Sequence, residues 1–307
     1  MHALPLVYNP NYHITGWKTD HRFPMPKYQL LHQLLIQNGV CGTKDFHQAK
    51  PAPRRALERV HLPGYLDDFQ SGNLDQRMIR RIGLPWSKGL VDRTLASSGG
   101  TLMAGHLALK HGMACNLGGG THHAFPDYGS GFCIFNDVSV ALRQLRAEAR
   151  IRRALIVDLD VHQGDGTAWI HREEPELYTF SMHCGENFPF QKQQSDLDLS
   201  LHQGMEDAEY LQILKNHLPS LIREHQPDLI FYNAGCDAHR DDPLGKLKLT
   251  SEGLFERDSY VFRTALEAGV PIASVLGGGY SPDHDEIAQR HSIVVRAAAQ
   301  VHSNQHN

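Results

Sequence analysis

Short, almost wholly hydrophobic stretches recur along the chain and alternate with longer amphipathic ones. The short stretches are rich in valine, isoleucine and leucine, and they are apolar at nearly every position rather than at every second one. This pattern is typical of strands in a parallel sheet that is covered on both faces. We therefore predict buried strands at 113–117, 154–157, 177–180, 229–232 and 272–276.

The longer stretches between these strands have the periodicity of helices. Near the C-terminus, Phe255, Phe262 and Leu266 recur at helical spacing and would form a broad apolar face on one side of a helix. The same kind of pattern appears twice earlier in the chain. Helices are accordingly predicted at 136–150, 206–225 and 252–268.

This alternation of strands and helices predicts an α/β fold, with a central, mainly parallel β-sheet flanked by helices on both faces and joined by right-handed crossovers. Pro219 is expected to kink or split the helix that contains it, because proline removes one backbone hydrogen bond. No composition break or internal repeat marks a linker. We therefore expect one domain over 1–307, ending in a short polar tail at 302–307.

Polar, glycine-rich sequences follow four of the predicted strands. In an open α/β sheet, ligand sites gather at the carboxyl ends of the strands, so these four loops should converge on one crevice. Their sequences are GGGTHHAFPDYGSGF (118–132), DLDVHQGDGT (158–167), NAGCDAHRDDPLG (233–245) and GGGY (277–280).

Composition narrows the classes of protein that fit. The 307 residues are 41% hydrophobic with a formal charge of −4, which suits a folded core and argues against direct nucleic-acid binding. The five cysteines include no C-x-x-C pair, so neither a disulfide framework nor a thiolate zinc site is expected. No signal peptide and no membrane-spanning apolar run is evident, which favours a cytoplasmic protein.

The second loop carries the pattern of a metal site. If the strand continues, Asp158, Asp160 and His162 share one face at a spacing of roughly 6.6 Å, where they would destabilise one another without a cation. Aspartate and histidine without cysteine suit zinc or a similar divalent ion, and Asp237 could be the third ligand beside an open position. The alternative is a solvated acidic loop with unrelated histidines.

The other loops supply groups for catalysis. His122 and His123 are candidates for general acid–base work, because imidazole titrates near neutral pH, and Asp158 and Asp165 could fix their tautomers. Opposite a metal, the phenol of Tyr280 would be a donor to a developing oxyanion; alone, it would be an aromatic residue on a turn.

Taken together, the four loops resemble the signature of the histone deacetylase family. The resemblance rests on GGGTHHA, DLDVHQGDG, NAGCDAH and GGGY in this order, and it extends from near the N-terminus to the last predicted helix. Three further stretches are similar to the class IV-like branch and its bacterial relatives. They are VYNPNYHIT (7–15), SGGTLMAG (98–105) and SDLDL (195–199).

The resemblance implies the arginase–deacetylase fold and a set of catalytic roles. By similarity, Asp160, His162 and Asp237 are the ligands of one catalytic Zn²⁺ per chain. His123 matches the general base and His122 its partner, while Tyr280 matches the tyrosine that stabilises the transition state. The carboxylates that orient the two histidines correspond to Asp158 and Asp165.

The resemblance also implies a substrate tunnel and a second ion. Gly131 and Phe132 match the tunnel wall, and the apolar side chains of Phe188 and Leu244 are expected to contact substrate near the same strand ends. A structural K⁺ would lie among residues at the ends of two neighbouring strands. These are Asp158, Asp160, Ser181 and Met182.

The implied reaction is zinc-dependent removal of acetyl or longer acyl groups from lysine side chains of proteins. Some relatives that prefer acetylated polyamines have glutamate where this chain has Leu244, so a neutral acyl-lysine is the favoured substrate. Hydrolysis of acetylpolyamines or other small acylamines remains the main alternative, and the acyl-chain length stays open. A binuclear manganese ureohydrolase and a non-catalytic acyl-amine binder are the remaining alternatives.

Overall fold

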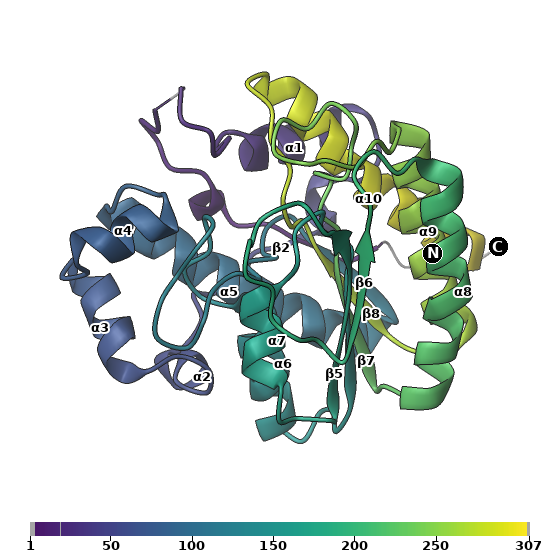
Figure 1. Cartoon of the computed structure of the whole chain (residues 1–307). Helices are drawn as coiled ribbons and strands as arrows, with labels where there is room; N and C mark the ends of the chain where they lie inside the picture. The colour runs from purple at the N-terminus through teal and green to yellow at the C-terminus, as the bar shows by residue number, and fades with distance from the viewer. Residues whose placement is uncertain (1–3, 19, 306–307) are drawn as a thin grey trace.

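The computed structural model describes residues 4–18 and 20–305, and its centre is one eight-stranded sheet (Figure 1). The strand order is β2-β1-β3-β8-β7-β4-β5-β6, and every neighbouring pair is parallel. The strands are β1 (Leu6–Val7), β2 (Phe46–His47), β3 (Met113–Asn116), β4 (Ala154–Asp158), β5 (Leu177–Cys184), β6 (Leu197–Leu201), β7 (Leu229–Asn233) and β8 (Ile272–Val275). The parallel α/β architecture predicted from the sequence is confirmed.

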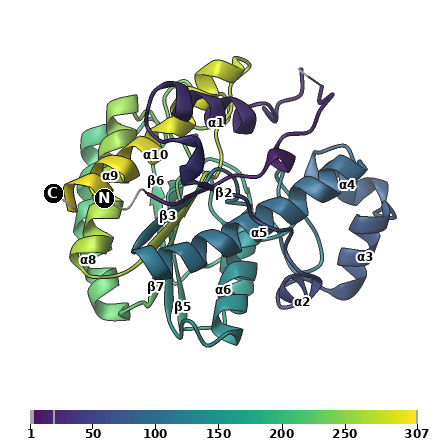
Figure 2. The ribbon, with the colours of Figure 1, turned by 180° about the vertical axis from the view of Figure 1, so that it is seen from behind.

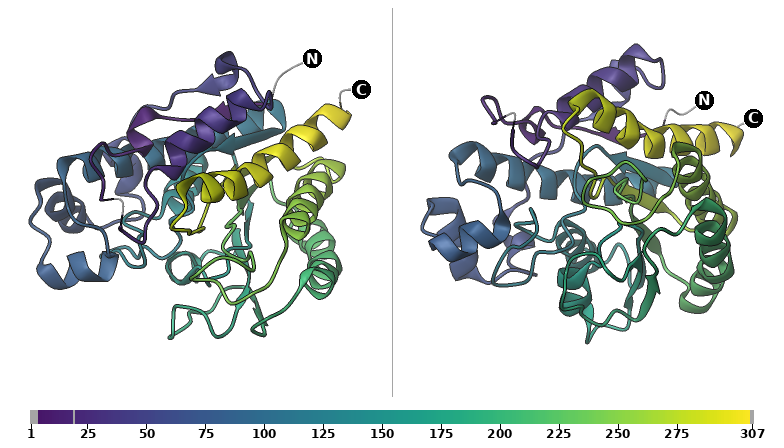
Figure 3. Two further views of the ribbon diagram at one scale, coloured as in Figure 1. Left: turned by 90° about the horizontal axis from the view of Figure 1, so that it is seen from above. Right: turned by 45° about the horizontal axis from the view of Figure 1, so that its top comes forward.

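Helices cover both faces of this sheet (Figures 1 and 2). α5 and α6 pack against one face, and α1, α8, α9 and α10 against the other. Figure 3 shows α1 and α10 side by side, although they come from opposite ends of the chain. The helices are α1 (Lys27–Gln37), α2 (Arg54–Leu57), α3 (Pro63–Ser71), α4 (Gln76–Ile82), α5 (Lys88–His111), α6 (Asp137–Ala147), α7 (Asp165–His171), α8 (Asp207–His225), α9 (Ser251–Glu267) and α10 (His284–Gln305).

The continuous hydrophobicity of the strands follows from burial on both sides. In β4, Ile156 packs into the core beneath α5 and α6, whereas its neighbours Leu155 and Val157 belong to the larger core on the opposite face. Successive side chains of a strand point to opposite faces, so a sheet with two covered faces needs apolar residues at every position. All five predicted strands are present, and β5 extends further than expected, to Cys184.

Side-chain caps fix the starts of several helices that lead away from the sheet. The Asn136 side chain accepts a hydrogen bond from the backbone N–H of Ser139 at the start of α6, and Thr250 caps α9 in the same way through Gly253. These caps satisfy backbone N–H groups that have no partner within the helix. The three predicted helices 136–150, 206–225 and 252–268 correspond to α6, α8 and α9.

Two expectations about the helices need correction. α8 is one continuous helix through Pro219, so the predicted split is wrong. Buried Leu214 and Leu218 before the proline and Leu221 after it lie in one core, and this packing holds both halves of the helix together. Residues 302–305 of the predicted tail belong to a helix, because α10 continues through Gln305; residues 306–307 lie outside the described residues. No helix in the described part of the chain is long and apolar enough to cross a membrane.

Candidate active site

The four glycine-rich loops meet at the carboxyl ends of β3, β4, β7 and β8, at one edge of the sheet. A pocket of about 980 Å³ opens there, and it is lined by His123, His162 and Tyr280 together with Asp165. A second, smaller cavity shares His123, His162 and Tyr280 with this pocket and is also lined by His122 and Asp160. The convergence predicted from the position of these loops at the carboxyl ends of strands is therefore present, and it brings together residues that are far apart in the sequence.

Three buried side chains, of which His162 also lines this pocket, form a group that could hold a metal ion. Ligand atoms of Asp160, His162 and Asp237 all lie within 4.8 Å of one another. The Nδ1 atom of His162 lies 3.0 Å from Oδ1 of Asp160 and 3.1 Å from Oδ2 of Asp237. All three side chains are buried, so the alternative of a solvated acidic loop is wrong.

The donor set and its surroundings fit a divalent cation. Burial, together with the charge of nearby Asp160, raises the pKa of Asp237 to about 6, so a cation between the two carboxylates would relieve an unfavourable arrangement. Nitrogen and carboxylate oxygen are donors that zinc accepts. Gly278 must lack a side chain, because a Cβ there would lie 2.0 Å from Oδ2 of Asp237.

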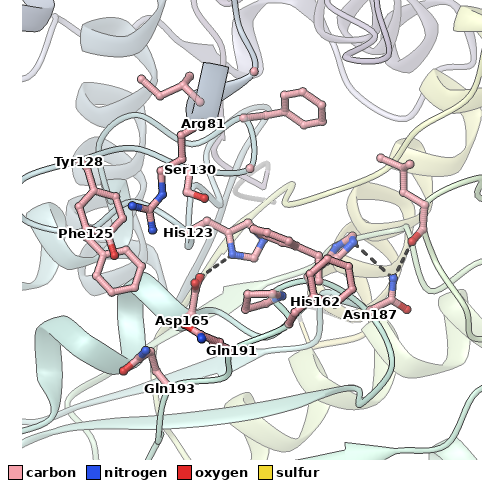
Figure 4. A pocket seen from close by; sticks show the side chains of 18 of the residues that line it. Arg81, His123, Phe125, Tyr128, Ser130, His162, Asp165, Asn187, Gln191 and Gln193 are labelled. Atoms are coloured by element: carbon pink, nitrogen blue, oxygen red, sulfur yellow. Dashed lines mark hydrogen bonds and ion pairs between the residues drawn. The ribbon is translucent and has the colours of Figure 1, made fainter. Parts of the chain in front are cut away.

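The two neighbouring histidines have different carboxylate partners. Nδ1 of His122 lies 2.7 Å from Oδ2 of Asp158. Nδ1 of His123 lies 2.7 Å from Oδ1 of Asp165, and Figure 4 marks this second contact with a dashed line. A carboxylate only accepts hydrogen bonds, so Nδ1 carries the proton in both rings. In the neutral ring, Nε2 is then the atom that can take a proton.

The electrostatic environments of these histidines also differ. Burial disfavours the charged form of His122, but the carboxylates of Asp158 and Asp160 outweigh it and raise the pKa to about 9. For His123, burial and the adjacent charge of His122 lower the pKa to about 4, despite the opposing effect of Asp165. The pair therefore combines a ring that holds a proton with a ring that is neutral at physiological pH.

The walls of the pocket are mainly apolar and come from three loops. Phe132, Phe188 and Leu244 line it, and Gly131 lies close to His123. Gly131 has a φ of 53°, and a Cβ at this position would lie 2.8 Å from Cδ2 of His123. Only glycine permits this backbone conformation and this approach to the imidazole together.

Tyr280 is buried beside the carboxylates, and its loop is held from two sides. Its backbone N–H donates to Oδ2 of Asp242 at 2.7 Å, and Nζ of buried Lys27 donates to the carbonyl of the preceding Gly279 at 3.1 Å. Burial, reinforced by the charge of Asp237, raises the pKa of the Tyr280 phenol well above its usual value. The phenol therefore remains protonated and able to donate a hydrogen bond.

The residues expected to hold K⁺ are also neighbours. Asp158 of β4 pairs in register with Ser181 of β5, and Met182 follows in the same buried strand. The hydroxyl of Ser181 lies 2.9 Å from Nδ1 of His183. Binding of K⁺ here stays a prediction.

Comparison with known proteins identifies the family. A model of the histone deacetylase domain matches residues 21–298. Histone deacetylase 2 of Arabidopsis thaliana is 32% identical, and the match covers 90% of this chain and 74% of the relative. The chain belongs to the histone deacetylase family. As a member, it is a hydrolase acting on amide bonds, and its resemblance to this family is confirmed.

Other histone deacetylase relatives span a range of similarity. An uncharacterized protein of Picosynechococcus is 52% identical over 98% of this chain and 100% of its own. The acetoin utilization protein AcuC of Staphylococcus aureus is 28% identical, covering 85% of this chain and 73% of the relative. The crystal structure of the HDA15 HD domain has a TM-score of 0.78 at 19% identity, covering 97% of this chain and 90% of that domain, which confirms the fold.

Three polar residues that were not predicted from the sequence form hydrogen bonds with residues of this histone deacetylase site. Asn233 donates to Oδ1 of Asp158 at 3.0 Å, Asp242 accepts from the Tyr280 backbone, and Asn187 donates to the Leu244 carbonyl at 2.6 Å. Asn233 and Asp242 belong to the NAGCDAHRDDPLG motif at the end of a strand, and this position could have indicated that they lie near the site. Asn187 lies in a loop with no comparable pattern, and only the fold reveals its contact.

Proposed function

We propose that this histone deacetylase-family hydrolase is a zinc-dependent lysine deacylase. The observation that carries the proposal is the buried Asp160–His162–Asp237 group, of which Asp160 and His162 line one cavity with His123 and Tyr280. Two buried carboxylates and an imidazole could hold zinc and leave a position open for substrate. One Zn²⁺ per chain, the nearby K⁺ and a cytoplasmic location are further parts of the proposal.

In the proposed reaction, the residues of the chain orient the substrate and move protons. When bound, zinc supplies Lewis-acid polarisation of the amide carbonyl and lowers the pKa of water. His123, oriented by Asp165 through Nδ1, takes the proton of the attacking water at Nε2. Tyr280 donates its phenolic O–H to the oxyanion that develops from the carbonyl. A protonated imidazole of the histidine pair then protonates the leaving amine.

The walls of the pocket favour an acyl-lysine over a polycation. Leu244 is partly buried in the wall and offers no charge to a second ammonium group. The basic side chains of Arg22, Arg81 and Lys246 also line the pocket and would repel a polyamine. Acetylpolyamine hydrolysis is therefore the less favoured alternative.

The test is a comparison of acyl substrates with the purified, zinc-loaded protein. Acetyl-, octanoyl- and myristoyl-lysine peptides are compared with acetylspermidine, and we expect hydrolysis of a lysine peptide to exceed that of acetylspermidine. His123→Ala should abolish release, whereas His202→Ala, which changes an exposed histidine, should not. Release that persists in His123→Ala would contradict the proposed role of His123. Faster hydrolysis of acetylspermidine would favour the polyamine alternative.

A further inference from the structure

Basic side chains predominate at the mouth of the pocket. Arg22, Arg81 and Lys246 line it and are exposed, and the exposed carboxylate that shares this lining is Glu186. Asp165 also lines the pocket, but it is buried and engaged with His123. The mouth therefore carries three cations against one exposed anion.

Backbone hydrogen bonds fix the segment that carries Arg81. The Arg81 carbonyl accepts from the N–H of Gly131 at 3.3 Å, and the Ile82 carbonyl accepts from the N–H of Phe132 at 2.8 Å. Both donors belong to the substrate tunnel wall. The Arg81 guanidinium then lies over the ring of Tyr128, with Cζ 3.6 Å from the ring centroid, and Figure 4 shows it beside this ring. Arg81 is therefore positioned against the wall of the pocket.

Arg22 is anchored to the same segment from the other side. Nε2 of His21 lies 3.1 Å from the carbonyl of Gly83, two residues beyond Arg81, and Nδ1 of His21 accepts from the backbone N–H of Phe23. These contacts hold the backbone on both sides of Arg22. Across the described residues 4–18 and 20–305, no carboxylate lies within 4.0 Å of the Arg22 or Arg81 guanidinium.

The opposite side of the mouth offers a third cation and an apolar contact. Nζ of Lys246 donates to the backbone carbonyl of Glu186 at 2.9 Å, which keeps this ammonium beside the pocket. Phe190 also lines the pocket and is 89% exposed. Nζ of Lys192 donates to the carbonyls of Asn187 and Pro189, and these bonds hold the loop that presents Phe190.

We infer that Arg22 and Arg81 select substrates in which acidic residues flank the acylated lysine. The inference rests on the proposed deacylase function and names its substrate class. Two guanidiniums without carboxylate partners suit side-chain carboxylates on a polypeptide that lies across the mouth while its acyl-lysine enters the tunnel. Arg22, Arg81 and Lys246 come from separate segments around the mouth, and the exposed ring of Phe190 lines the same pocket. Contacts this widely spread favour a peptide over a free amino acid.

The experiment compares three peptides that differ only at the residues next to acetyl-lysine, which are glutamate, glutamine or lysine. The zinc-loaded protein should show a kcat/KM for the glutamate peptide about threefold to tenfold above that for the glutamine peptide, as two exposed ion pairs would provide. The lysine peptide should be the poorest substrate. High salt should reduce the preference, because it screens exposed charges.

Variants connect the preference to the two arginines. In Arg22→Gln/Arg81→Gln, the ratio of the glutamate to the glutamine peptide should fall to about one, and each single variant should lose part of it. The matched control is Arg223→Gln, which removes an exposed arginine of α8 outside this pocket and should keep the ratio of the unaltered protein. Thermal unfolding of each variant checks that it is folded.

Two results would overturn the inference. They are equal kcat/KM values for the glutamate and glutamine peptides, and a preference for the glutamate peptide that survives in the double variant. Isothermal titration calorimetry with the same peptides separates this inference from the proposed function. Preferential binding of the glutamate peptide without hydrolysis of any peptide would support the role of the two arginines and contradict the proposed deacylase function. Hydrolysis of the peptides without any preference would support the deacylase function and contradict the role of the arginines.

Discussion

The histidine pair illustrates how partners differentiate identical side chains. His122 and His123 are adjacent and buried, yet Asp158 and Asp160 both lie near the first ring, whereas Asp165 is the carboxylate bonded to the second. Asn233 also donates to Asp158 and fixes its orientation. Two chemically equal imidazoles thereby acquire opposite pKa shifts, which suits one to hold a proton and the other to accept one.

Replacement of Tyr280 tests the other proton donor of the site. Tyr280→Phe removes the phenolic O–H and keeps the ring, so turnover of an acetyl-lysine peptide should fall roughly 100-fold or more while zinc stays bound. Steady-state kinetics and metal analysis on the same sample check both parts. Tyr128→Phe, which changes a tyrosine at the pocket mouth, is the control and should lose far less. Unchanged turnover in Tyr280→Phe would contradict the oxyanion role.

At the scale of elements, the loop after β3 does two tasks. It carries His122 and His123 and returns at Gly131 and Phe132 to line the pocket, so one segment supplies both imidazoles and part of the surface against which His123 packs. Phe132 adopts a φ of 66°, which is rare for a residue with a side chain, directly after the positive φ of Gly131. The wall thus depends on two consecutive left-handed residues.

Gly131→Ala should impair catalysis through this loop. The added Cβ would lie 2.8 Å from Cδ2 of His123, so the ring must move, and we expect kcat to fall at least about tenfold with a stability loss of about 1–2 kcal/mol. Gly204→Ala is the matched control, because Gly204 has a φ of 84° and open space around its Cβ. It should lose similar stability in urea unfolding but keep its kcat. An equal fall of kcat in both variants would contradict the steric argument.

At the scale of the molecule, the sequence predicted the parts of the fold that depend on local pattern. The five central strands are buried on both faces, so their hydrophobic runs are continuous and easily located. β1 and β2 have two residues each, and β6 is only partly buried and contains Asp198 and Ser200, so none of these three has a recognisable pattern.

In the candidate site, too, the sequence predicted the residues that belong to a local pattern and missed those that only the packing of the chain brings together. Residues that follow strands, such as Asp160 and Tyr280, could be anticipated because parallel strands end at one edge of the sheet. The contact between Lys27 and Gly279 joins residues 252 positions apart. Of the cations at the mouth, Arg81 lies in α4, Arg22 and Lys246 lie in loops, and no motif marks any of the three. Such contacts depend on how α1 and α4 pack in the folded chain, and this is a property of the whole fold.

His61 connects the stability of the whole molecule to pH. Its ring is buried, with Nδ1 donating to the Phe125 carbonyl at 3.1 Å and Nε2 accepting from the Asn136 N–H at 3.0 Å. Protonation of Nε2 would break the second bond, and burial lowers the pKa of His61 from 6.5 to about 3. The unfolded chain therefore binds more protons than the folded chain between these two values, so the free energy of unfolding rises with pH across this interval.

Acidification from neutral pH should accordingly destabilise the protein, with a contribution from His61 of up to about 1.4 kcal/mol per pH unit. In His61→Gln this contribution disappears, since glutamine can donate and accept but does not titrate, and the free energy of unfolding should depend less steeply on pH. Urea unfolding at several pH values between about 4 and 7 measures both slopes. His47→Gln, at an exposed position of β2, is the control and should keep the original slope. Equal slopes for His61→Gln and the unaltered protein would show that His61 is not neutral in the folded state, and its bond to Asn136 would then need another explanation.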